Sequence, residues 1–185
     1  MDPITRLQAS VDQTRLIVAA TSVDQFGSST PCPDWDVRAL INHTLGALTM
    51  FRDVGSKGEA DMGVFGQDLV GTDAAASFDD VAAATLAAWR AEGRMARPAK
   101  MPWGEMPADV ALQILANDVL VHGWDLAKAT GQRVAWGQGL AEETLNFARA
   151  MFTPELKGDD FAAEVAVAPG ADAMARLVAF EGREP

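Results

Sequence analysis

The segment from about Pro107 to Thr130 constrains the fold more than any other part of the sequence. Its apolar residues recur at helical spacing, and Gly131 is suited to end a helix there. The apolar stripe comprises Ala111, Ile114, Leu115, Leu126 and Ala129. A long helix with such a stripe must bury it against other elements, so the sequence predicts a core built around this segment.

Three ionisable residues interrupt this stripe. On a helical wheel Asp118, His122 and Asp125 fall on the face that the apolar residues predict to be buried. An unpaired carboxylate in an apolar interior costs several kcal/mol, roughly, so the cluster needs a partner, a proton or a metal ion. Asp118 and His122 are four residues apart and lie one turn above the other, which lets them chelate one ion or simply hydrogen-bond each other.

The pattern of the rest of the chain also predicts helices joined by turns, without the clear alternation of apolar and polar residues that is typical of strands. Helices are expected over about 3–21, from Asp36 as N-cap through Phe51, over 77–93 with Ser77 or Asp79 as the cap, and over 140–152 and 171–180. A glycine-rich loop is expected from Gly55 to Thr72, regular structure is expected to end at Pro98 and Pro102, and residues 164–167 could form a short extended piece. The pattern predicts an all-α bundle.

Composition and charge narrow the class of protein. At 185 residues, without a change in composition along the chain, we expect a single domain over 1–185. No stretch approaches the roughly 20 apolar residues of a membrane span, and the N-terminus lacks the pattern of a secretory signal. The formal charge of −11, with no basic stripe, excludes nucleic acid as a partner. The single cysteine, Cys32, rules out an intrachain disulfide and agrees with a cytoplasmic location.

His43 supplies a third candidate ligand from a second helix. It lies at the edge of the apolar stripe of the helix that follows Asp36, so it can point into a seam between helices. His43, Asp118 and His122 would leave a fourth position free, as in catalytic zinc sites. We expect zinc, and nickel, iron or manganese would also tolerate these ligands. Asp125 is not expected to bind the ion itself; it would orient His122 or bond a backbone donor or an arginine.

Other residue types admit two interpretations or exclude a chemistry. Cys32 could be a ligand or nucleophile, although a thiol between two prolines is more often packed and inert. Trp35, Trp103 and Trp124 could line a pocket or belong to the core. The glycine-rich loop lacks the Lys-Ser or Lys-Thr ending of a phosphate-binding loop, and no serine lies in a Gly-x-Ser-x-Gly motif, so nucleotide hydrolysis and serine hydrolase chemistry lose support.

Two motifs carry a resemblance to a known family. The run Thr30-Pro31-Cys32-Pro33-Asp34-Trp35-Asp36-Val37-Arg38 with His43, and the run from Asp118 to Ala127 continuing to Gly131, resemble the metal-binding domain of actinobacterial relatives of mycothiol-dependent maleylpyruvate isomerase. Residues 102–107 and 176–183 also look like this group. The wider group is that of the DinB/YfiT-like metalloenzymes.

The resemblance implies a four-helix bundle of up-down-down-up connectivity, here with a short C-terminal extension. It also implies that a divalent metal is held by one histidine of the second helix and by an acid-x-x-x-His or His-x-x-x-His pair of the fourth. These positions map onto His43, Asp118 and His122. The isomerase has Glu where this chain has Asp118, and it carries a separate C-terminal domain, so its substrate and reaction do not transfer.

These observations lead to three hypotheses. In the first, the protein is a metal-dependent enzyme, a transferase or isomerase acting on a small molecule with mycothiol or another small thiol as cofactor; no catalytic base can be named. In the second, it is a non-catalytic protein that binds a metal or small ligand for a stress response or sequestration. In the third, the two histidines and Asp118 satisfy one another without metal. The chain could also form a homodimer through an exposed helix face.

Overall fold

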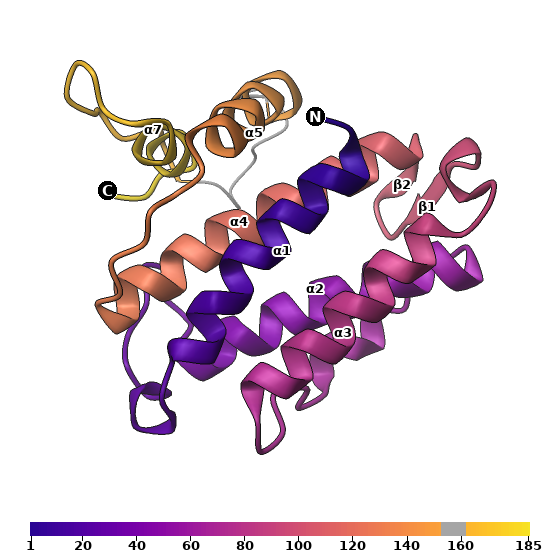
Figure 1. Cartoon of the computed structure of the whole chain (residues 1–185), viewed down its shortest axis with the longest axis horizontal. Helices are drawn as coiled ribbons and strands as arrows, with labels where there is room; N and C mark the ends of the chain where they lie inside the picture. Colours follow the sequence, from indigo (N-terminus) through magenta and orange to yellow (C-terminus); the bar gives the residue numbers. More distant parts are fainter. Residues whose placement is uncertain (153–161) are drawn as a thin grey trace. The chain divides into compact units, whose positions relative to one another are not determined.

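A computed structural model describes residues 1–152 and 162–185, and these residues are mostly helical (Figure 1). They form six α-helices, three short 3-10 helices and one two-stranded sheet. The chain divides into two compact units, residues 2–132 and residue 1 with residues 133–185. The all-α class is confirmed, and the single domain over 1–185 stays a prediction.

The larger unit is a four-helix bundle. Its helices are α1 (Pro3–Ala20), α2 (Val37–Lys57), α3 (Ala74–Arg90) and α4 (Ala108–Thr130). α1 packs against α4 and α3, and α2 packs against α3 and α4, so the four close into a ring. Figure 1 shows α1 and α4 running in one direction and α2 and α3 in the other, which is the up-down-down-up connectivity.

Aspartates cap three helices of the bundle, and a glycine ends the fourth. The carboxylates of Asp2, Asp36 and Asp73 accept hydrogen bonds from backbone N–H groups in the first turns of α1, α2 and α3. Gly131 ends α4 with a φ of 70°, in the left-handed region that favours glycine. The start of α3 differs from the expectation: Asp73, not Ser77 or Asp79, is the cap, because its carboxylate bonds the N–H of Ala76.

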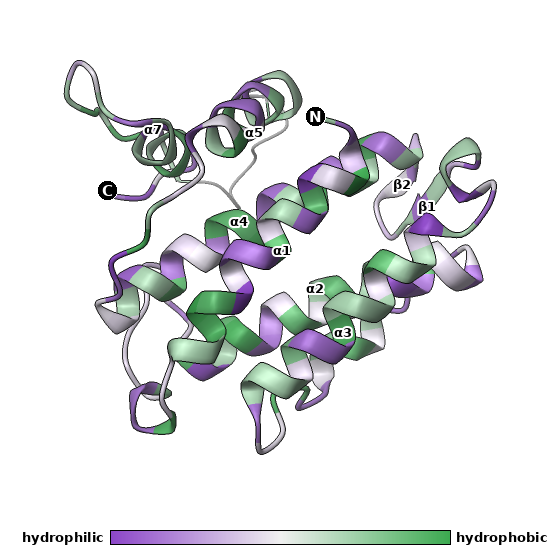
Figure 2. Ribbon diagram, in the orientation of Figure 1, coloured by the Kyte–Doolittle hydropathy of each residue, from purple (hydrophilic) through white to green (hydrophobic). Residues whose placement is uncertain are grey.

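The core of the bundle consists of the apolar faces of these four helices. Apolar residues recur along each helix with polar ones between them (Figure 2). α1 and α4 approach closely at Gly123, where an added Cβ would lie 2.3 Å from Oγ1 of Thr14. Thr14 donates to the carbonyl oxygen of Val119, one turn before Gly123. The close contact therefore lies next to His122 in the sequence of α4.

The glycine-rich connection between α2 and α3 begins later than expected. Gly55 lies inside α2, where it faces Ala88 and Trp89 of α3, and a Cβ there would lie 2.9 Å from the side chain of Ala88. The glycine serves helix packing rather than a turn. The connection carries the 3-10 helix η2 (Met62–Gly66), and Asn42 of α2 bonds the backbone of Gln67 and Leu69 within it.

Two further 3-10 helices and a hairpin complete this unit. The 3-10 helices are η1 (Val23–Gln25) and η3 (Arg94–Ala96). Regular structure was expected to end at Pro98 and Pro102, yet β1 (Ala99–Met101) and β2 (Gly104–Met106) pair antiparallel, with Lys100 opposite Glu105. Each strand has only three residues, too few to give a period-two pattern in the sequence.

The smaller unit contains α5 (Gln138–Met151) and α7 (Ala173–Phe180), which pack against each other. Asp172 caps α7, and Arg176 pairs with Glu142 across the two helices. Residues 164–167, where an extended piece was considered, lie outside any strand, although the N–H of Val165 bonds the carbonyl of Ala179. Pro154 and Gly158, two residue types that favour a loop after α5, lie outside the described residues.

Across the described parts of the chain, every helix is too short or too polar to span a bilayer. The cytoplasmic location and the homodimer stay predictions.

Candidate metal centre

The structure brings the three expected ligands together between α2 and α4. Nε2 of His43 lies 3.6 Å from Oδ1 of Asp118, and Nε2 of His122 lies 3.5 Å from the same oxygen. The three ligand atoms lie within 4.8 Å of one another. Asp118 and His122 share one face of α4 because they are four residues apart, and His43 faces them across the seam.

These separations suit an ion better than direct hydrogen bonds. An N–H···O bond usually spans about 2.9–3.0 Å, shorter than either distance. Two ligand atoms that each lie about 2.0–2.1 Å from a tetrahedral zinc ion are roughly 3.4 Å apart. In addition, Oδ2 of Asp118 is buried with no hydrogen-bond partner among the residues that the structure describes. Two imidazoles and a carboxylate with a spare oxygen fit a divalent cation of the zinc type.

The centre is only partly shielded from solvent. The side chain of His122 is 10% exposed, whereas those of His43 and Asp118 are 26% and 28% exposed. An ion among these atoms would therefore be anchored on a buried imidazole. His43 and Asp118 form the more exposed side of the centre.

The electrostatics of the cluster are those of a coupled acid and base. Burial opposes the charged form of Asp118, but the positive charge that the nearby imidazoles of His122 and His43 can carry holds the pKa of Asp118 well below its ordinary value. Burial likewise opposes the imidazolium of His122, but the negative charge of Asp118 raises the pKa of His122 well above 6.5, and contacts of the imidazole with Asp125 and Cys32 act in the same direction. Asp118 and His122 therefore each favour the charged form of the other.

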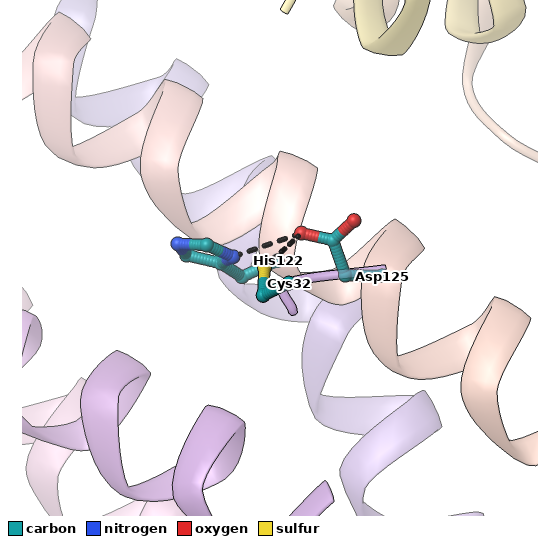
Figure 3. Close-up of side chains that lie close together, drawn as sticks. All are labelled: Cys32, His122 and Asp125. Carbon is teal, nitrogen blue, oxygen red and sulfur yellow. Dashed lines mark hydrogen bonds and ion pairs between the residues drawn. The ribbon is translucent and has the colours of Figure 1, made fainter. Parts of the chain in front are cut away.

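Asp125 lies where a group that orients His122 would be expected. Its side chain is fully buried, and its Oδ2 lies 3.0 Å from Nδ1 of His122 (Figure 3). Asp125 follows His122 by three residues and Asp118 precedes it by four. Both carboxylates that the ring contacts therefore come from the same helix as the ring. A proton on Nδ1 that is donated to Asp125 leaves Nε2 free to act as a ligand.

Cys32 joins this group from the connector before α2. Its Sγ lies 3.4 Å from Oδ2 of Asp125, the same oxygen that faces His122 (Figure 3). Cys32, His122 and Asp125 form a second set whose ligand atoms lie within 4.8 Å of one another. The sequence offered a reactive or a packed thiol as alternatives, and the structure places the thiol beside the centre.

Two aromatic rings lie beside His43. The ring of Trp35 lies over it, with centroids 4.3 Å apart and an interplanar angle of 30°, and the ring of Phe65 lies 5.6 Å away. Trp35 also contacts His122, at 5.7 Å. Of the other tryptophans considered, Trp124 is buried in the core and Trp103 is exposed on the hairpin.

Phe65 is the contact that the sequence did not reveal, since it lies in the glycine-rich connection without periodicity around it. A signal existed in Gly46, one turn after His43 in α2. A Cβ at Gly46 would lie 2.8 Å from Cδ1 of Phe65, so only glycine leaves room for the ring.

Comparison with known proteins covers all of these residues. A family model described as the mycothiol maleylpyruvate isomerase N-terminal domain matches residues 7–127. Two proteins described as uncharacterised, from two strains of Mycobacterium tuberculosis, are each 32% identical over 190 residues, covering 99% of this chain and 98% of theirs. The likeness to these relatives therefore extends beyond the bundle into the smaller unit.

Solved structures share the fold of the bundle. The crystal structure of the mycothiol-dependent maleylpyruvate isomerase superposes with a TM-score of 0.58 at 17% identity, over 77% of this chain and 66% of that one. A histidine-to-alanine mutant of the same enzyme gives 0.59 at 16% identity. This chain thus matches slightly less than two thirds of the isomerase, and at such identities the likeness concerns the fold alone.

Proposed function

The chain belongs to the mycothiol maleylpyruvate isomerase N-terminal domain family, and on that premise we propose that it is a divalent-metal-dependent enzyme that uses a small thiol. His43, Asp118 and His122 hold the ion, zinc being the first choice and nickel, iron or manganese the others. Mycothiol is the proposed thiol, because the solved protein that shares the fold is described as mycothiol-dependent. The reaction class is transfer or isomerisation of a small molecule.

The observation that carries the proposal is the incomplete hydrogen bonding of the Asp118 carboxylate. Its Oδ1 faces two imidazole nitrogens at 3.5 and 3.6 Å, while its buried Oδ2 has no partner among the described residues. A carboxylate that only closed an ion pair with His122 would be expected at hydrogen-bond distance. The longer spacing supports a cation between the groups.

The other residues of the centre have separate tasks. Asp125 accepts the Nδ1 proton of His122 and so directs Nε2 toward Asp118 and His43. Trp35 and Phe65 lie against the ring of His43, with ring centroids 4.3 and 5.6 Å away, and so limit its movement. A divalent ion held there supplies Lewis acidity, which lowers the pKa of a thiol or water in its open position.

Elemental analysis by mass spectrometry tests the ligand set. We expect about one ion per chain in tag-free wild type and a loss in His43→Ala, Asp118→Ala and His122→Ala, each shown by circular dichroism to be folded. Asp68→Ala, which alters an exposed carboxylate paired with Arg38, is the matched control and should retain the ion. Wild type that takes up no zinc, nickel or manganese would refute the proposal.

Calorimetric titration of the metal-loaded protein with mycothiol tests the thiol step. We expect heat release in wild type and none after the metal is removed. A metal-loaded protein that gives no heat and no spectral change with mycothiol would eliminate the thiol-dependent enzyme. The ion would then belong to a non-catalytic metal-binding or sequestration protein.

A further inference from the structure

The ring of His122 separates two groups of side chains. Nε2 faces Asp118, which also faces His43, whereas Nδ1 faces Asp125, which also faces Cys32. The proposed function assigns a task to each of these residues except Cys32. The position of its sulfur therefore needs an explanation of its own.

The thiol shares an acceptor with the imidazole. Oδ2 of Asp125 accepts from Nδ1 of His122 at 3.0 Å and from Sγ of Cys32 at 3.4 Å (Figure 3). Asp125 is 0% exposed, and a buried carboxylate keeps a fixed position only when donors surround it. The S–H group is one of the donors that fix this oxygen.

The backbone around Cys32 holds the sulfur in place. The N–H of Cys32 donates to Oγ1 of Thr30 at 3.1 Å, and the same hydroxyl lies 2.8 Å from the carbonyl oxygen of Trp35. The turn between Thr30 and Trp35 thus carries two contacts with the centre, the thiol on Asp125 and the indole ring over His43. The turn is therefore part of the support of the centre.

We propose that Cys32 is a positioning residue: its S–H donates to Oδ2 of Asp125 and fixes the carboxylate that holds the proton on Nδ1 of His122, which keeps Nε2 directed toward the ion. This inference rests on the proposed function. Supports of this kind typically change metal affinity about 10–100-fold when they are removed. Cys32 is not itself a ligand here, because the two ring nitrogens point in different directions and the sulfur lies on the Nδ1 side.

Three variants of the full chain test this role. Cys32→Ala removes the donor, Cys32→Ser restores a donor of similar size, and Asp34→Ala alters an exposed residue of the same turn. Affinity for Co²⁺ is measured by competition with a chromogenic chelator. We expect Cys32→Ala to bind about 10–100-fold more weakly, and Cys32→Ser and Asp34→Ala to stay within a few-fold of wild type.

Nitrogen-15 NMR of the imidazoles adds a readout that needs no metal. The chain has only two histidines. In metal-free protein, above the pKa of His122, we expect its proton on Nδ1 in wild type and Cys32→Ser, and a mixture of tautomers in Cys32→Ala. If no Co²⁺ binds to wild type while this pattern holds, the proposed function fails but the positioning of His122 by Cys32 stands.

Two results would overturn the inference. One is a Cys32→Ala variant with the affinity and tautomer of wild type, which would make the thiol an inert neighbour. The other is a sulfur-to-cobalt charge-transfer band in wild type that disappears in Cys32→Ser. Because Cys32 is the only cysteine, such a band would identify it as a ligand.

Discussion

Nε2 of His43 and Oδ1 of Asp118 face each other across the seam between α2 and α4 at 3.6 Å. The two residues come from helices joined by 50 residues of chain, 58–107, which include all of α3. Their separation exceeds a hydrogen bond and agrees with two ligands of one ion. The stability of the bundle should therefore depend on whether an ion occupies this position.

Metal ions should raise the thermal stability of the bundle. An ion at about 100 times its Kd adds about 2.7 kcal/mol, which for a chain of this size corresponds to roughly 5–10 °C in the melting temperature. Circular dichroism melts with zinc and with a chelator measure the difference. His43→Ala should melt at the same temperature in both, and a wild type indifferent to the chelator would contradict the prediction.

Substitutions of Asp118 should separate charge from reach. Asp118→Asn keeps the shape but loses the anionic ligand, and we expect its zinc affinity to fall by more than about 100-fold, beyond the effect of losing a supporting residue. Asp118→Glu keeps the carboxylate on a longer arm and should bind within about 10-fold of wild type. Competition with a chromogenic chelator measures both. Equal affinities for the two variants would show that the charge of Asp118 is not needed.

The metal-free protein should be most stable at mildly acidic pH. The pKa of His122 is raised in the folded state, so its contribution is complete below the ordinary value of 6.5 and is lost as pH rises through the raised pKa. The pKa of Asp118 is lowered, so its contribution is present above 3.8 and is lost as pH falls through the lowered pKa. Both contributions to stability are therefore present between pH 3.8 and pH 6.5.

Urea unfolding in a chelator at a series of pH values checks this window. The free energy of unfolding should decline above pH 6.5 in wild type and change less in Asp118→Asn, because His122 then lacks its main anionic neighbour. With saturating zinc the trend should reverse, since protons compete with the ion for the imidazoles. A metal-free protein that gains stability steadily from pH 6 to 9 would contradict an ion pair between His122 and Asp118.

The ring of Trp35 should support His43 and report on the ion. Trp35→Leu removes the ring that lies 4.3 Å from the imidazole, and we expect the zinc affinity to fall about 10-fold, as for other supporting contacts. Co²⁺ should quench part of the tryptophan fluorescence in wild type and less of it in this variant. Trp103→Leu, which alters a ring 56% exposed on the hairpin, should change neither property.

Gly123 should be intolerant of a side chain. In Gly123→Ala the Cβ would meet Thr14 at 2.3 Å, and forcing α1 away from α4 should cost about 1–3 kcal/mol. Gly27→Ala is the control, because no atom lies within 4 Å of a Cβ there. Urea unfolding compares the two variants. Equal stability would mean that the helices separate without cost.

The sequence predicted the parts of the centre that depend on helical spacing. Asp118, His122 and Asp125 lie on one face of α4 because of the 3.6-residue repeat, and a carboxylate and an imidazole inside an apolar stripe stood out. Asp36 and Gly131 marked helix ends through their caps. These signals are local, so one sequence was enough to recognise them.

Contacts between distant segments were beyond such reasoning. Cys32 and Asp125 are 93 positions apart, and Phe65 reaches His43 from a connection without periodicity. The hairpin was missed because its strands are too short to show alternation, and Gly55 was read as a breaker although it fits a helix crossing. In each case the packing of two elements decides the structure.

Because two of the candidate ligands lie on α4 and one on α2, the complete set forms only when these two helices pack together. Asp118 and His122 are in place as soon as α4 is helical, and His43 arrives only when α2 docks beside it. An ion that binds before the helices pack together would be held only by Asp118 and His122 and would be released quickly. Once His43 is in place as the third ligand, the ion would be released more slowly. Capture of the ion would thus mark the moment at which the seam between α2 and α4 closes, and its rate of escape would measure how often that seam reopens.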